Sequence, residues 1–280
     1  MINIDQLIDL AIIEDLGDGD HSSLATISPQ AIGKASVFAK GNNGIIAGIE
    51  EATLVCRRID PNLKLTFFKK DGNKITKGDK ILTIEGNSQK ILQSERLILN
   101  FMQRMSGIAT TTAQYVEKIA DLPTKLLDTR KTTPLMRYFE KKAVKIGGGQ
   151  NHRFGLYDMI MIKDNHIDFA GGIENAITKT LQYLKSIDKK LKIEIEVRSF
   201  DELNQVLKVG GVDTIMLDNF TPQKCKQAVE IINKRYKTEA SGGITIDNIR
   251  EYALSGVDYI SVGALTHHIQ SLDLSMLVEI

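Results

Sequence analysis

The segments GVDTIMLDN (residues 211–219) and GVDYISVGA (residues 256–264) decide the predicted fold, because they are near-copies of each other. Each starts with a glycine, continues through a short apolar run and ends in polar or small residues. A glycine in this place is typical of a helix that ends and passes the chain on to a strand. The pattern therefore predicts a repeated unit made of a strand, a polar loop and a helix.

The same unit recurs throughout the second half of the chain. Six short apolar runs are each followed by polar or glycine-rich residues: 126–127, 159–162, 193–195, 215–217, 239–240 and 259–262. The last four polar clusters begin at Glu196, Asp218, Ser241 and Gly263, about 22 residues apart. Alternating strands and helices need a parallel sheet with crossover helices. We therefore predict a βα barrel.

Helix starts in this region carry their own signals. A threonine that can cap the helix precedes a first-turn proline at Thr221-Pro222 and at Thr133-Pro134. We predict that a helix begins at each of these pairs.

The first part of the chain has a different pattern. Short elements separated by turn residues are predicted there: a helix over 2–14, a strand within 34–49 with a turn at 42–44, and three β segments between 63 and 85. A helix follows from Gln93 to about Ile119, which Ser106-Gly107 is expected to interrupt. We place the domain boundary near Ile108, with an α/β domain over 1–108 and the barrel over 109–280.

Composition and charge exclude several protein classes. The chain is 42% hydrophobic and 25% charged, with a net charge of +1, so neither a nucleic acid nor a membrane is expected as a partner. The acidic N-terminal stretch does not resemble a signal peptide, and no apolar run approaches membrane-spanning length. Cys56 and Cys225 have no paired spacing, which argues against disulfides and thiolate metal sites. We expect a cytoplasmic protein.

Positive charge gathers in one part of the chain. Between residues 125 and 166 the lysines and arginines exceed the acids by five. In βα barrels the functional site lies at the carboxyl ends of the strands, where this sequence places Arg130, Lys131 and Lys163. Arginines such as Arg130 and Arg153 bind carboxylates or phosphates through paired hydrogen bonds. The cluster predicts an anionic ligand. Three further cations after Pro134 are interpreted as a solvated helix face: Arg137, Lys142 and Lys145.

Two carboxylates follow successive predicted strands. Glu196 and Asp218 would lie beside each other at the barrel mouth. Adjacent hard oxygen ligands amid cations favour a Mg²⁺ site that also holds substrate oxygens. A plain ion pair with Lys163 is the alternative.

The last two strands end in glycine-containing loops. Ser241-Gly242-Gly243 and Gly263-Ala264 can bring backbone amides close to an oxyanion, as phosphate sites in barrels do. Glycine as a simple turn residue is the alternative. Among the histidines, His152 is the one expected to touch a ligand, because it adjoins Arg153.

Nine motifs together resemble the quinolinate phosphoribosyltransferase family, also called nicotinate-nucleotide pyrophosphorylase (carboxylating). They are Ser94-Glu95-Arg96, Ser106-Gly107-Ile108-Ala109-Thr110, Asp128-Thr129-Arg130-Lys131-Thr132, Gly147-Gly148-Gly149, Asn151-His152-Arg153, Lys163-Asp164-Asn165-His166, Leu217-Asp218-Asn219, Ser241-Gly242-Gly243 and Val262-Gly263-Ala264-Leu265-Thr266. Departures are small: Ser22 and Ser23 stand where a threonine is common, and Ala240-Ser241 where Ser-Ser is common.

The resemblance implies a fold and an assembly. The fold would be an N-terminal α/β, sandwich-like domain followed by an incomplete, open βα barrel, with a C-terminal tail that can return to the first domain. Two chains would form a homodimer, with shared active sites, in which one N-terminal domain caps the partner's barrel. Arg96 would then reach the site across the dimer interface.

The resemblance also implies roles for individual residues. Quinolinate and pyrophosphate would be surrounded by Arg96, Thr129, Arg130, Lys131, His152, Arg153 and Lys163. The catalytic residues would be Lys163, Glu196 and Asp218, of which Glu196 and Asp218 face the ribose and Mg²⁺, directly or indirectly. The 5′-phosphate would lie against Ser241, Gly242, Gly243, Val262, Gly263 and Ala264.

The implied reaction transfers a phosphoribosyl group from phosphoribosyl pyrophosphate to quinolinate with decarboxylation, a step of NAD biosynthesis. Other classes remain open from the residues alone. A Schiff-base lyase would use Lys163 as its nucleophile, and a phosphate-sensing module would bind phosphate without turnover. A paralogous phosphoribosyltransferase associated with molybdenum transport is disfavoured by the intact His152-Arg153 motif.

Overall fold

The computed structural model describes residues 3–41 and 43–279. The chain forms two compact units: the first is Met1–Ala113, Thr132–Gly148 and Leu265–Ile280, and the second is Gln114–Lys131 and Gly149–Ala264. The predicted boundary near Ile108 lies inside a long helix, α4 (Ser88–Lys118). Among the described residues, no helix combines the length and the apolar composition that a membrane span requires.

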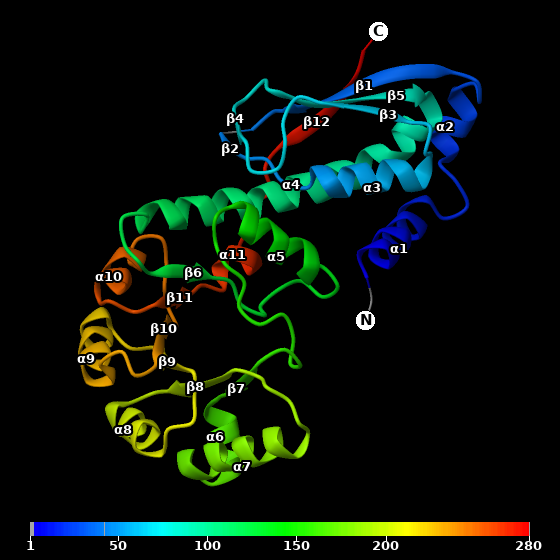
Figure 1. Cartoon of the computed structure of the whole chain (residues 1–280). Coiled ribbons are helices and arrows are strands. Elements are labelled where there is room, and N and C mark those ends of the chain that lie inside the picture. Colours follow the sequence, from blue (N-terminus) through cyan, green and yellow to red (C-terminus); the bar gives the residue numbers. More distant parts are fainter. Residues whose placement is uncertain (1–2, 42, 280) are drawn as a thin grey trace. The chain divides into compact units, whose positions relative to one another are not determined.

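The first unit contains an antiparallel sheet with the strand order β12-β1-β5-β3 (Figure 1). Its elements are α1 (Ile4–Leu16), α2 (His21–Thr26), β1 (Ile32–Ala39), β2 (Gly44–Ile45), α3 (Ile49–Ile59), β3 (Lys64–Phe67), β4 (Lys74–Ile75), β5 (Lys80–Asn87), α5 (Arg137–Ile146) and β12 (Leu274–Val278). The alternation that predicted the first strand is explained by burial, since Ala35, Val37 and Ala39 are at most 2% exposed. The C-terminal strand β12 pairs with β1, from Ala35 opposite Val278 to Ala39 opposite Leu274.

Helix α4 passes without a break through Ser106-Gly107, so the predicted interruption is wrong. The Ser106 hydroxyl accepts the Ala47 N–H at 2.9 Å and donates to the Ala47 carbonyl at 3.2 Å. A Cβ on Gly107 would stand 2.3 Å from the carbonyl oxygen of Gln270. The two small residues therefore allow neighbouring backbone to approach the helix, and they do not form a turn.

Helix α5 begins later than predicted. Its first residue is Arg137 and its N-cap is Met136, so the predicted start at Thr133-Pro134 is wrong. Leu135 between them has a φ of 63°. A leucine in this left-handed region cannot belong to a right-handed helix, which therefore starts after it.

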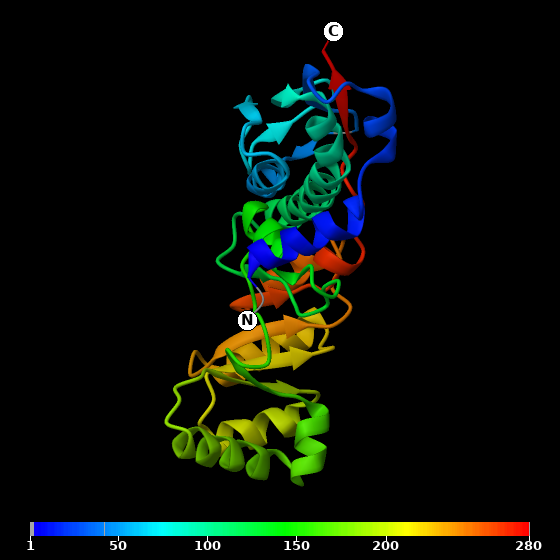
Figure 2. The same cartoon turned by 90° about the vertical axis from the view of Figure 1, so that its right-hand side faces the viewer.

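The second unit contains a parallel sheet with the strand order β6-β11-β10-β9-β8-β7. Its elements are β6 (Lys125–Leu127), β7 (Ile160–Ile162), α6 (Asp164–Ala170), α7 (Ile173–Ser186), β8 (Ile193–Val197), α8 (Phe200–Val209), β9 (Thr214–Asp218), α9 (Pro222–Ile232), β10 (Lys237–Ser241), α10 (Ile249–Leu254) and β11 (Tyr259–Ser261), and the short α11 (Ala264–His267) follows. Within the described residues no ladder joins β6 to β7, so the barrel is open. Helices α8, α9 and α10 lie along the outer side of the strands (Figures 1 and 2). The predicted α/β fold with an open βα barrel is confirmed.

Local signals in the second unit also hold. Gly211 and Gly256, which precede β9 and β11, have φ values of +80° and +87°. The Thr221 side chain accepts the Lys224 N–H at 3.3 Å, and Pro222 is the first residue of α9. These residues set the junctions between helices and strands.

Strand register determines which side chains share one face of the sheet. Successive side chains of a strand alternate between faces, so Glu194 and Glu196 of β8 lie on the same face. Glu196 pairs with Met216 of β9, which in turn pairs with Glu239 of β10. Four of the described acidic side chains therefore share this face: Glu194, Glu196, Asp218 and Glu239.

Candidate active site

The carboxyl ends of the parallel strands bring most of the predicted site residues to one edge of the second unit. These residues are Thr129, Arg130 and Lys131 after β6, Lys163 after β7, Glu196 in β8, Asp218 in β9, Ser241, Gly242 and Gly243 at β10, and Val262, Gly263 and Ala264 after β11. Because all six strands run in the same direction, residues far apart in the sequence meet at this edge.

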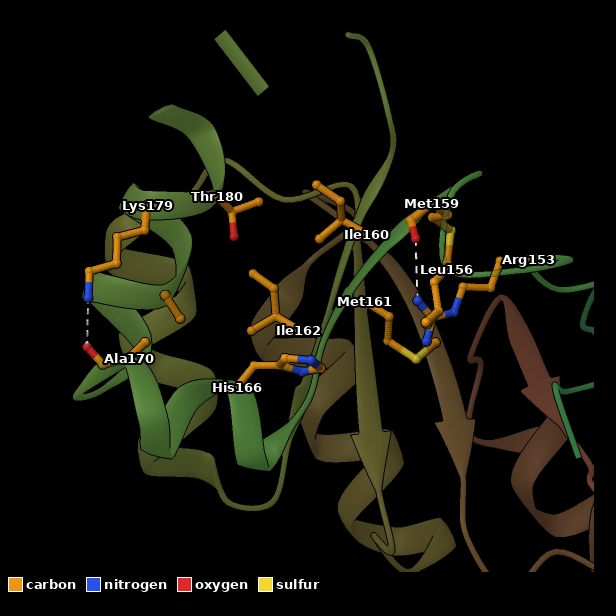
Figure 3. A pocket seen from close by; sticks show the side chains of 11 residues that line it. Arg153, Leu156, Met159, Ile160, Met161, Ile162, His166, Ala170, Lys179 and Thr180 are labelled. Carbon is orange, nitrogen blue, oxygen red and sulfur yellow. Dashed lines mark hydrogen bonds between the residues drawn. The ribbon is translucent and has the colours of Figure 1, made fainter. Parts of the chain in front are cut away.

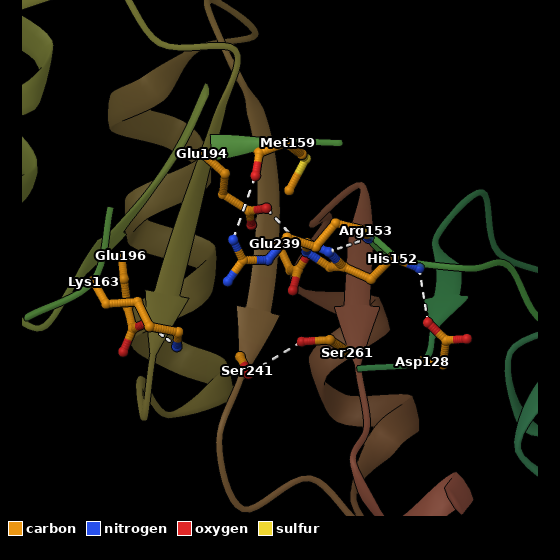
Figure 4. Close-up of polar contacts among 10 residues, drawn as sticks. All are labelled: Asp128, His152, Arg153, Met159, Lys163, Glu194, Glu196, Glu239, Ser241 and Ser261. Carbon is orange, nitrogen blue, oxygen red and sulfur yellow. Dashed lines mark hydrogen bonds and ion pairs between the residues drawn. The ribbon is translucent and has the colours of Figure 1, made fainter. Parts of the chain in front are cut away.

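Lys163 and Glu196 form an ion pair at this edge (Figure 4). Lys163 Nζ donates to Glu196 Oε2 at 2.8 Å, and the two side chains are 43% and 9% exposed. Lys163 is the N-cap of α6, and its backbone N–H donates to His166 Nδ1 at 2.9 Å. The pair considered above as an alternative to a metal site is thus present. Its lysine remains accessible to an anion.

Asp218 lies on the strand next to Glu196. Since Glu196 pairs with Met216, Asp218 lies two residues further along β9, on the same face. Asp218 Oδ2 accepts a hydrogen bond from Asn219 Nδ2 at 2.7 Å. Two hard oxygen donors on adjacent strands suit Mg²⁺, which usually keeps several waters or substrate oxygens as further ligands.

The glycines after β10 have two different local reasons. Gly242 has a φ of +94°, and a Cβ there would stand 2.2 Å from Asn219 Oδ1. Gly243 has a φ of +64°, but a Cβ there would meet no atom within 4 Å. The turn interpretation therefore explains Gly242, whereas the backbone of Gly243 borders the open space that an oxyanion would need.

Arg130 and Arg153 contribute positive charge close to each other. Burial lowers the pKa of Arg153, and the charge of Arg130 lowers it further. Arg153 Nη1 donates to the Met159 carbonyl at 3.4 Å. Two neighbouring guanidinium groups repel each other, and a bound anion would relieve that repulsion.

Behind this edge lies a buried cluster of one histidine and two glutamates. His152 Nε2 is 3.0 Å from Glu194 Oε2 and 3.4 Å from Glu239 Oε2. The three side chains are 7%, 3% and 1% exposed. Burial disfavours a charged His152, but the hydrogen bonds and negative charge of the two glutamates outweigh burial and raise its pKa to about 10. Burial and the charge of Glu239 raise the pKa of Glu194 to about 7.

The sequence analysis did not assign Glu194, Glu239 or Asp128 to the site. The two glutamates lie inside strands, whereas the search considered residues that follow apolar runs. Their signal was a spacing of two residues, which puts Glu194 on the face of Glu196 and Glu239 on the face of Ser241. Asp128 is fully buried and accepts the His152 N–H at 2.8 Å and Asn151 Nδ2 at 2.6 Å.

Two family descriptions cover nearly the whole chain. Residues 20–106 match "Quinolinate phosphoribosyl transferase, N-terminal domain", and residues 108–277 match "Quinolinate phosphoribosyl transferase, C-terminal domain". The chain belongs to the quinolinate phosphoribosyl transferase family. The family predicted from the motifs, and its class of enzyme, are confirmed.

Individual relatives agree with this family. The chain is 43% identical to the chloroplastic carboxylating nicotinate-nucleotide pyrophosphorylase of Arabidopsis thaliana, over 98% of this chain and 82% of the relative. It is 40% identical to a probable carboxylating nicotinate-nucleotide pyrophosphorylase of Bacillus subtilis, over 98% and 93%. The crystal structure of NadC from Streptococcus pyogenes is 40% identical and superimposes with a TM-score of 0.93, covering 99% of this chain and 96% of that one.

A cavity of about 360 Å³ borders the phosphoribosyl transferase site at β7, α6 and α7 (Figure 3). Arg153 and His166 line it together with apolar side chains such as Ile160 and Ile162. The predicted residues Lys163, Glu196 and Asp218 do not line it. Arg153 thus connects the polar strand ends to an apolar cavity beside the first strand of the open edge.

Arg96 lies in the other compact unit. It is exposed on α4, which carries the Ser94-Glu95-Arg96 motif of the family. Its predicted contribution to a partner's site stays a prediction, as do the roles assigned above to the other site residues.

Proposed function

We propose that this member of the quinolinate phosphoribosyl transferase family transfers the phosphoribosyl group of phosphoribosyl pyrophosphate to quinolinate and releases nicotinate mononucleotide, pyrophosphate and CO₂. The observation that carries the proposal is the set of charges at one sheet edge, where Arg130, Arg153 and Lys163 occur together with Glu196 and Asp218. Relatives about 40% identical over the whole chain are named for this reaction.

The cations address a physical obstacle of this reaction. Both substrates are polyanions, so bringing them together costs electrostatic repulsion. Arg130 and Arg153 suit the two carboxylates of quinolinate because a guanidinium binds a carboxylate through two hydrogen bonds. Lys131 and Lys163 add compact positive charges that suit the pyrophosphate. Lys131 is exposed, and its N–H donates to Thr129 Oγ1 at 3.0 Å.

The carboxylates suit the chemistry at the ribose. The ring nitrogen of quinolinate forms a bond to the anomeric carbon while the bond to pyrophosphate breaks, and the electron pair leaves with pyrophosphate. Positive charge develops at the anomeric carbon, where Glu196 and Asp218 would stabilise it. The carboxylate next to the nitrogen then leaves as CO₂, and the ring carbon keeps the electron pair and takes up a proton.

We include Mg²⁺ in the proposed function. The oxygen atoms of Glu196 and Asp218, on adjacent strands, are donors of the kind that this cation prefers. When bound, Mg²⁺ would neutralise charge on the pyrophosphate as it departs.

The test mixes the protein with phosphoribosyl pyrophosphate, Mg²⁺ and either quinolinate or nicotinate, and measures CO₂ and nucleotide. We expect turnover with quinolinate and one CO₂ for each nucleotide. Turnover of nicotinate alone would overturn the assignment. Borohydride trapping of a carbonyl substrate on Lys163 would instead support a Schiff-base lyase.

We also propose a homodimer with shared sites. Arg96 is exposed on α4, and the edge strand β12 presents Leu277 and Val278, which are 48% and 62% exposed. Exposed apolar residues on an edge strand favour association. Mixing inactive Arg96→Ala chains with inactive Lys163→Ala chains should restore part of the activity. No recovery after verified subunit exchange would exclude shared sites.

A cytoplasmic location is proposed as well. Cys56 and Cys225 are buried free thiols, as is usual in a reducing compartment. Several plant relatives are named chloroplastic or mitochondrial, so the compartment differs within the family. Fractionation of the source cells with detection of the native chain tests the location.

A further inference from the structure

The cluster of His152, Glu194 and Glu239 has no role in the mechanism above. Its three side chains converge from the segment after residue 150, from β8 and from β10 (Figure 4). The other carboxylate oxygens, Glu194 Oε1 and Glu239 Oε1, are buried without a hydrogen-bond partner. Burying two carboxylates around one imidazole is costly. Such an arrangement calls for an explanation beyond packing.

The second ring nitrogen of His152 shows what the cluster holds. His152 Nδ1 accepts the backbone N–H of Arg153 at 2.7 Å. An acceptor nitrogen needs a free lone pair, so the ring proton belongs on Nε2, between the two glutamates. The glutamates alone favour a doubly protonated ring, but its Nδ1–H would then oppose the Arg153 N–H at 2.7 Å. We give the hydrogen bond more weight, because two donors at this distance repel each other.

The backbone of the same segment is fixed from its other side. Asp128 Oδ1 accepts the His152 N–H at 2.8 Å, and Asp128 Oδ2 accepts Asn151 Nδ2 at 2.6 Å. Arg153 follows directly, and its guanidinium lies near Arg130 and donates to the Met159 carbonyl. Buried acids on three strands or strand ends therefore hold the backbone that carries Arg153.

We propose that Glu194 and Glu239 are positioning residues that act through His152: they keep its proton on Nε2, so that Nδ1 fixes the backbone of Arg153 and directs the guanidinium to a substrate carboxylate. The inference rests on the proposed function for the identity of that substrate. It assigns the two glutamates no contact with substrate.

The first test removes both acceptors of the Nε2 proton. Glu194→Met/Glu239→Met should raise the KM for quinolinate about tenfold or more, as is typical when the groups that orient a functional histidine are lost. The kcat should stay within about threefold, because ground-state binding is what the cluster supports. Glu194→Gln/Glu239→Gln keeps amide oxygens as acceptors and should retain most of the affinity. Glu251→Gln, an exposed acid on α10, is the matched surface control.

A double-mutant cycle asks whether His152 acts through Arg153. We expect that His152→Ala raises the KM for quinolinate strongly in the wild-type background and changes it less than about twofold in an Arg153→Ala background. Equal factors in both backgrounds would show that His152 acts independently of Arg153. A loss of kcat with unchanged KM in the Met pair would likewise overturn the proposal.

A measurement on the unaltered protein needs neither turnover nor a variant that folds. In protein labelled with ¹⁵N at histidine, His152 should show one protonated nitrogen, Nε2, and one unprotonated nitrogen, Nδ1. The spectrum of His152→Gln assigns the signals. A proton on Nδ1 would overturn the inference even if quinolinate is turned over. Absence of quinolinate turnover would overturn the proposed function and leave this result standing.

Discussion

Two lysine–glutamate pairs of nearly equal length occur in the two units, and they differ in exposure. In the first unit Lys142 Nζ lies 2.7 Å from Glu51 Oε1, with side chains 22% and 0% exposed, and a second carboxylate, Glu50, also contacts this lysine. In the second unit Lys163 Nζ lies 2.8 Å from Glu196 Oε2, with side chains 43% and 9% exposed. The distances alone do not distinguish the pairs. Exposure indicates that one supports the fold and that the other is available to a ligand.

The first pair also corrects an expectation. Lys142 was interpreted as part of a solvated helix face, but it forms ion pairs with α3. Burial of Glu51 raises its pKa, although the hydrogen bond and charge of Lys142 act in the opposite direction. A buried carboxylate of this kind depends on its cation, because an unpaired buried charge is strongly destabilising.

The largest expected effect breaks the exposed pair. Lys163→Ala should lower kcat/KM about 10²–10³-fold, as is typical when one electrostatic contact to developing charge is removed. The midpoint of thermal unfolding should stay almost unchanged, because the lysine is 43% exposed. Steady-state kinetics and calorimetry on the same preparation check both parts. Lys163→Arg is the charge-keeping comparison. A large loss of stability with normal turnover would reverse the roles of the two pairs.

The next effect breaks the buried pair. Lys142→Met should lower the free energy of unfolding by about 3 kcal/mol, because Glu51 is left buried without its cation. The turnover of the folded fraction should not change. Urea unfolding measures the stability, and Glu50→Gln, at a side chain 65% exposed, is the control with little expected effect. A stable Lys142→Met protein would show that Glu51 does not need this cation.

A smaller effect sharpens the chemistry of the exposed region. Chelation of Mg²⁺ should stop turnover, and Asp218→Asn should raise the Mg²⁺ concentration for half-maximal activity about tenfold, because one oxygen charge is lost from the site. Mg²⁺ titrations of initial rates measure this shift. Asp201→Asn, an exposed acid in α8, serves as the comparison. An unchanged midpoint would remove Asp218 from the metal site.

The smallest effect concerns a property that the two units share. Burial raises the pKa of Cys56 in the first unit and of Cys225 in the second to about 12. A raised thiol pKa leaves the protonated form dominant, and at pH 8 only about one thiol in 10⁴ is a reactive thiolate. Iodoacetamide followed by mass spectrometry should find neither cysteine modified in the native protein and both modified in denaturant. Rapid labelling of one cysteine would reveal local opening of its unit.

Several features could be predicted because they depend on neighbouring residues. Glycine followed by an apolar run located β9 and β11, and the register of parallel strands brought Lys163 and Glu196 together. Local signals failed where a distant segment changed the meaning of a residue. Gly107 looks like a helix breaker, but its missing side chain makes room for the backbone at Gln270.

The sequence by itself determined the succession of strands and helices, the family, and the cations and carboxylates at the strand ends, because periodicity and motifs are properties of neighbouring residues. Only the tertiary structure decided which acids are buried together. Glu194 and Glu239 are separated by many residues and meet at His152 because β8 and β10 flank β9 and turn the same face inward. The cost of burying their charges depends on that meeting, and no segment of the chain contains it alone.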